Sequence, residues 1–63
     1  MTQKELSYTE DAVGHENSII SILEDSVKNL EDEDLISFMN EELQKHEQTK
    51  QRLINLLEEK TNE

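Results

Sequence analysis

Three residues of this 63-residue chain could bind protons or metal ions inside a bundle of helices. Glu16 interrupts one apolar stripe, and Glu42 and His46 interrupt a second. Carboxylates with an imidazole suit iron or manganese, and a histidine beside a carboxylate can also hold a proton near neutral pH. The residue types and their spacing therefore predict a polar layer, used either for metal binding or for hydrogen bonding.

The stripe that carries Glu16 predicts an amphipathic helix over residues 5–29. Its apolar residues recur every seven positions, with companions three positions further on, as in the seam of a packed helix. These residues are Leu6, Val13, Ile20, Leu23, Val27 and Leu30. Ala12 and Ile19 widen the stripe on one side and Ile22 widens it on the other, so more than one neighbouring helix is expected. Two capping-box patterns, Ser7–Glu10 and Thr2–Glu5, could each start this helix.

The second stripe is out of phase with the first by about one residue, or roughly 100° of helix rotation. It consists of Leu35, Met39, Leu43, Leu53, Leu56 and Leu57. A break at residues 30–33 explains the shift, because Asp32 can cap a new helix whose first turn carries Glu33 and Asp34. A second helix is thus predicted over residues 33–60. One continuous helix is the alternative, because this turn has neither Gly nor Pro, but it would present charge to a partner along half of its length.

These segments predict an all-α fold, in which residues 1–63 form a single antiparallel helical hairpin. A chain of this size buries only about 60% of its unfolded surface, and the absence of Cys rules out disulfide support. We therefore expect self-association, as a homodimeric four-helix bundle or a higher homo-oligomer. The residues expected to drive it are Leu6, Val13, Ile20, Leu23, Val27, Leu35, Met39, Leu43, Leu53 and Leu57.

A hairpin centred on residue 31 places residue n level with residue 62 − n, so that Glu16 faces His46. Glu42 lies one turn away on the face of His46, and a dimer would gather two copies of all three residues. Four carboxylates and two imidazoles match the ligands of di-iron or di-manganese bundles, although those bundles usually space Glu and His three residues apart rather than four. The alternative is a hydrated or hydrogen-bonded layer that includes Thr49 and fixes the helix register. A contact from Glu16 to Lys50 would likewise remove the need for a metal cofactor.

The charge balance excludes several classes of partner. Sixteen Asp and Glu against six Lys and Arg give a net charge of -10, which disfavours direct binding to nucleic acid or to anionic membranes. No segment approaches the ~20 apolar residues of a membrane span, and the N-terminal residues lack the apolar run of a signal peptide. We therefore expect a cytoplasmic protein. No serine has a base arranged around it, so no catalytic residue is predicted.

The stretch Glu33–Glu47, with the sequence EDLISFMNEELQKHE, resembles the second helix of small ferritin-like proteins, including CotF-type spore coat proteins. In those proteins an acidic cap and a Leu lead into a helix that carries Glu and then His. The preceding arm, with Glu16 turned inward, is similar to a ferritin-like first helix. The resemblance implies half of a four-helix bundle, with either a coat or interaction role or the relic of a metal site.

Three functions are consistent with these features. The first is a non-enzymatic, acidic, self-associating helical protein with a structural or interaction role and an unknown protein partner. The second is a di-metal carboxylate protein, assembled across a dimer, for storage, redox or oxygen chemistry. The third is an acidic decoy that mimics nucleic acid and occupies a basic protein surface.

Overall fold

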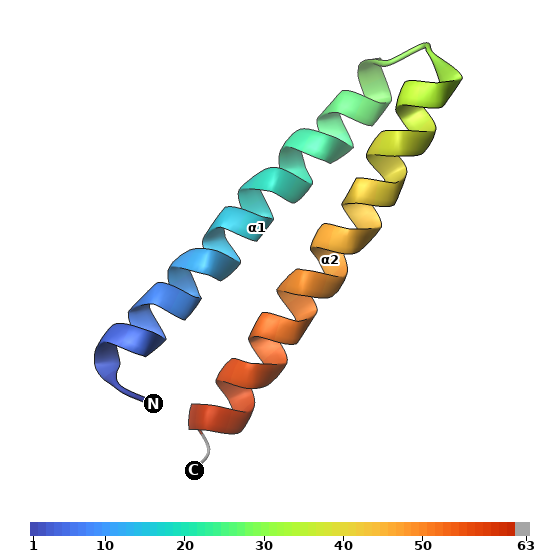
Figure 1. Cartoon of the computed structure of the whole chain (residues 1–63). Helices are drawn as coiled ribbons and strands as arrows, with labels where there is room; N and C mark the ends of the chain where they lie inside the picture. Colours follow the sequence, from blue (N-terminus) through green and yellow to red (C-terminus); the bar gives the residue numbers. More distant parts are fainter. Residues whose placement is uncertain (62–63) are drawn as a thin grey trace.

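The computed structural model describes residues 1–61 and consists of two long helices, α1 over Gln3–Asn29 and α2 over Glu33–Thr61. The two helices pack against each other along their lengths in antiparallel directions, so the start of α1 lies beside the end of α2 (Figure 1). The molecule is thin, with principal extents of 47 × 15 × 11 Å. The all-α helical hairpin predicted from the two stripes is confirmed.

A reciprocal capping box starts α1. The backbone N–H of Glu5 donates to Thr2 Oγ1 over 3.1 Å, and the backbone N–H of Thr2 donates to Glu5 Oε1 over 2.8 Å. The Thr2 backbone bond, assisted by its hydroxyl, holds the pKa of Glu5 below its ordinary value. The helix therefore begins about two residues before the expected start, and Ser7–Glu10 lies within it.

The turn between the helices is closed by an aspartate cap. Leu30 leaves α1 in an extended conformation, with φ -91° and ψ 146°. Asp32 Oδ1 then accepts hydrogen bonds from the backbone N–H groups of Asp34 (2.9 Å) and Leu35 (3.1 Å), as the sequence predicts. No residue among 1–61 has a positive φ. This backbone path explains why the turn needs no glycine.

A heptad pattern of buried and half-buried residues runs along the contact between the helices. On α1 these seam residues are Leu6, Thr9, Val13, Glu16, Ile20, Leu23, Val27 and Leu30. On α2 they are Ile36, Met39, Leu43, His46, Lys50, Leu53 and Leu57. Ile20, 9% exposed, is the most enclosed of the described apolar residues. Nine of the ten residues expected to drive self-association thus line the seam within one chain.

Leu35 and Leu56 lie outside this seam, although the sequence predicts both for the stripe of α2. They expose 47% and 49% of their surface, and each precedes a seam residue by one position. One position on a helix is a rotation of about 100°, which turns both leucines onto the flank. Ile36 occupies the seam position at the start of α2 instead. For these two residues the prediction of a shared buried stripe is wrong.

Candidate functional site

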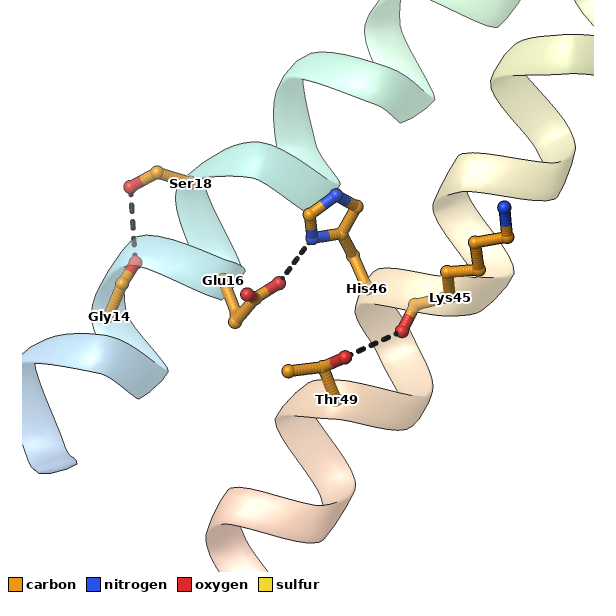
Figure 2. Close-up of polar contacts among 6 residues, drawn as sticks. All are labelled: Gly14, Glu16, Ser18, Lys45, His46 and Thr49. Carbon is orange, nitrogen blue, oxygen red and sulfur yellow. Dashed lines mark hydrogen bonds and ion pairs between the residues drawn. The ribbon is translucent and has the colours of Figure 1, made fainter.

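The polar layer of the hairpin is built on a direct contact between Glu16 and His46. Nδ1 of His46 lies 2.6 Å from Oε2 of Glu16, and the two side chains approach each other from facing seam positions (Figure 2). The side chain of Glu16 is 16% exposed and that of His46 is 30% exposed. The pairing predicted by the register about residue 31 is confirmed.

The chemistry of an ionised carboxylate partner assigns the proton of this contact to one imidazole nitrogen. An ionised carboxylate can only accept hydrogen bonds, so Nδ1 of His46 donates to Glu16. In the neutral imidazole, Nε2 then carries the lone pair and is the nitrogen that can accept a hydrogen bond or bind a metal. The charged acceptor makes this bond stronger than one between neutral groups. The pair therefore links α1 and α2 by a polar side-chain contact.

The other residues predicted for the layer do not join this contact. Glu42 is half-buried on the flank of α2, and its Oε1 lies 3.5 Å from Nζ of Lys45. Thr49 is exposed, and its hydroxyl donates to the backbone carbonyl of Lys45 over 3.0 Å (Figure 2). Lys50 is half-buried in the seam one turn after His46. Within residues 1–61, the side-chain contact of Glu16 is made with His46 rather than with Lys50.

A metal site would require groups from a second chain. Within residues 1–61 no group of three or more His, Cys, Asp or Glu side chains is placed to hold a metal ion. Glu16 and His46 are together, but Glu42 turns to Lys45. The site of Glu16, Glu42 and His46 that the sequence predicts for iron or manganese therefore stays a prediction about the dimer.

A second feature of the hairpin is a line of apolar side chains beside the seam. Tyr8, Ile22, Leu35, Phe38 and Leu56 are all exposed, by 70%, 63%, 47%, 55% and 49%. Each lies one position before a seam residue of the same helix. Because seam residues alternate at spacings of three and four, the positions immediately before them lie on one side of the seam.

Both helices present these positions to the same side of the molecule. In an antiparallel helix pair, the positions one before each seam residue lie on the same side of the molecule in both helices. Ile19, half-buried, lies in the middle of this side on α1. We call the surface made by Tyr8, Ile19, Ile22, Leu35, Phe38 and Leu56 the apolar face. The opposite side carries polar and charged residues, with Ile54 as its apolar exception.

The sequence pattern predicts part of the apolar face but does not separate it from the seam. It places Ile19 and Ile22 on opposite sides of the first stripe, whereas both precede a seam residue and lie on the same side. It also assigns Leu35 and Leu56 to the second stripe and does not include Phe38. The available signal was the position of each residue relative to the heptad, which distinguishes a seam leucine from a flanking one.

Neither helix contains, within the described residues, a stretch apolar enough to cross a lipid bilayer. Comparison with protein-family models, with curated proteins and with solved structures finds no match to this chain. The function is therefore argued from the seam, the Glu16–His46 pair and the apolar face.

Proposed function

We propose that this chain is a small, acidic, self-associating helical protein with a structural or interaction role and no catalytic activity of its own. The observation that carries the proposal is the apolar face, on which five large side chains are 47% or more exposed. Monomeric proteins rarely leave this many large apolar side chains uncovered on one side. A second hairpin placed on this face would complete a four-helix bundle, the architecture implied by the ferritin-like resemblance of residues 33–47.

The surface area of the hairpin supports the same proposal. A compact folded monomer of 7.4 kDa exposes about 4200 Å². This chain exposes 5039 Å². The excess of about 800 Å² is the area that one partner buries in a protein interface of standard size. One hairpin therefore has the surface of a molecule that is completed by association.

Analytical ultracentrifugation tests the proposal directly. At micromolar concentration, the expected species is a dimer or a larger oligomer, with a mass at least twice the 7.4 kDa of the chain. Far-UV circular dichroism of the same sample shows whether the chain is helical. A helical, monodisperse monomer at these concentrations would contradict the proposal, because the apolar face would then be stable in water.

A further inference from the structure

We infer that the apolar face binds a second copy of this chain whose turn lies at the opposite end, with a two-fold axis at the level of the Glu16–His46 pair. This inference rests on the proposed self-association and adds which surface is used and in which orientation. Three observations support it: the charge on the apolar side, the location of the acidic turn, and the spacing of the apolar residues along α2.

The apolar side is nearly neutral, although the chain is strongly acidic. Counting the positions one before each seam residue, together with Glu59 where the same heptad position recurs near the end of α2, this side carries Glu5, Glu42 and Glu59 against Lys45 and Arg52. Three carboxylates against two cations give a net charge of -1, out of -10 for the whole chain. Two copies can therefore bring these sides together with little repulsion, whereas any other pairing would bring acidic surfaces into contact. A basic protein would be drawn to the opposite side instead.

The acidic turn decides between the two possible orientations. Glu31, Asp32, Glu33 and Asp34 lie at one end of a hairpin whose long dimension is 47 Å. If both turns lay at the same end, eight carboxylates would meet there. With the turns at opposite ends, the two runs are separated by several Debye lengths, each about 8 Å at physiological salt.

Two of the apolar residues of α2, Leu35 and Leu56, are spaced symmetrically about the polar layer. Leu35 and Leu56 have their midpoint beside His46, and each lies roughly 16 Å from it along the helix. A two-fold axis across the helices at this level would place Leu35 opposite Leu56 of the second copy. The same axis would place Phe38 near Arg52 of the second copy, a pairing of an aromatic ring with a cation.

Charge substitutions on the apolar face test which surface is used. Ile22→Glu and Phe38→Glu place a carboxylate in the proposed contact. Their dimer dissociation constants should rise by about a hundredfold, because a charge without a partner is excluded from an apolar contact. Ser21→Glu and Ser37→Glu add the same charge at exposed positions one residue away, on the opposite side, and should leave dimerisation unchanged. For all four variants, sedimentation equilibrium measures the dimer dissociation constant and circular dichroism checks that the chain is helical.

Single cysteines test the orientation without adding charge, since the natural chain has no Cys. An equimolar mixture of Leu35→Cys and Leu56→Cys chains should form a disulfide-linked heterodimer under mild oxidation, and each variant alone should form much less. With the turns at the same end, Leu35 would instead lie level with Ser26 of the second copy. Dominant cross-linking between Leu35→Cys and Ser26→Cys chains would therefore overturn the proposed orientation.

These experiments separate the failure of this inference from the failure of the proposed function. If the natural chain is a dimer but Ile22→Glu and Phe38→Glu dimerise as well as their controls, the apolar face is not the interface and self-association stands. If the natural chain is a folded monomer, both proposals fail. If the monomer is stable and a different protein covers the face, heterocomplex formation is lost in Ile22→Glu and kept in Ser21→Glu, which also overturns the second copy as the occupant.

Discussion

At the scale of single residues, the main departure from an apolar seam is the contact between Glu16 and His46. Both occupy positions where the heptad places apolar side chains, and their 2.6 Å contact satisfies one polar group with the other. A polar pair of this kind contributes little net stability compared with two apolar side chains, but removal of one partner leaves the other unsatisfied. We therefore propose that the pair specifies the register of the two helices more than it stabilises the hairpin.

Substitution of one or both partners tests this role. His46→Leu should lower the free energy of unfolding by about 1–3 kcal/mol, because it leaves the Glu16 carboxylate without its donor. The double variant Glu16→Leu/His46→Leu should be at least as stable as the natural chain, because two leucines fill the seam. Denaturant unfolding followed by circular dichroism, at one fixed concentration, measures all three proteins, with Gln44→Leu at an exposed position of α2 as the control. A lower free energy of unfolding for the double variant than for His46→Leu would contradict this account.

The Glu16–His46 pair is also part of the predicted metal site. Metal content in the natural chain and in single-residue variants tests that prediction. We expect protein purified without chelator to contain no stoichiometric iron or manganese, because Glu42 is paired with Lys45 and does not join Glu16 and His46. Elemental analysis of the natural chain measures this directly. About one metal ion per chain, lost in both Glu16→Ala and His46→Ala but kept in His15→Ala, would instead establish a di-metal site across the dimer.

At the scale of the helices, the start of α1 depends on the reciprocal bonds between Thr2 and Glu5. Because these bonds hold the pKa of Glu5 below its ordinary value, they contribute to stability above that ordinary value. The contribution is lost as the pH falls through the lowered pKa. The first turn of α1 should therefore fray in acid.

An NMR titration of the Glu5 side-chain carboxyl carbon tests this behaviour. The midpoint should lie below the ordinary pKa of glutamate in the natural chain and should return toward it in Thr2→Ala, which removes the hydroxyl partner. Ser7→Ala lies outside the capping box and should leave the midpoint unchanged. If the midpoint of Glu5 in the natural chain is no lower than the ordinary pKa of glutamate, the capping box does not form in solution.

The middle of α1 contains a glycine that no contact within the hairpin requires. A Cβ atom added at Gly14 would meet no atom within 4 Å, and the residue is exposed on the side away from the apolar face. Gly14→Ala should therefore raise the free energy of unfolding by about 0.5–1 kcal/mol, because it removes backbone freedom from the unfolded chain. Thermal unfolding measures the gain. A loss of stability or of dimerisation would show that another copy approaches the helix closely at Gly14.

The sequence alone predicted those features of the two helices that depend on chain reversal and local chemistry. A turn centred on residue 31 is enough to bring Glu16 level with His46, and Asp32 has the side chain of a helix cap. The rotation of α2 was harder to predict, because the neighbours Leu56 and Leu57 can each be the inward residue. That choice depends on where α1 lies. The choice between the two capping boxes also depends on packing, since a start at Thr2 brings Leu6 into the seam.

At the scale of the whole molecule, the hairpin has a nearly neutral apolar side and an acidic surface elsewhere. Most of the net charge of -10 lies away from the apolar side, which alone has the composition of an interface. A dimer formed through the apolar faces would carry the acidic surfaces outward on both sides. In such a dimer this distribution would limit further growth, because any additional contact would join like charges.

This charge distribution makes the salt dependence of association a test of what holds the complex together. When NaCl is raised from about 0.01 M to about 1 M, the Debye length falls from about 30 Å to about 3 Å, so repulsion between the acidic chains is screened. Dimerisation through the apolar face should therefore tighten, with a fall in the dissociation constant on the order of tenfold. Sedimentation equilibrium at several salt concentrations measures it.

A charge-reduced control separates screening from a general effect of salt on apolar contacts. The triple variant Asp11→Asn/Glu24→Gln/Glu47→Gln removes three carboxylates from exposed positions outside the apolar face. It should dimerise more tightly than the natural chain at low salt and should show a weaker response to added NaCl. The acidic decoy hypothesis predicts the reverse sign, since a complex with a basic protein surface weakens as salt rises. A complex of this chain that dissociates in salt would thus be held by its acidic surface, and the apolar face would need another explanation.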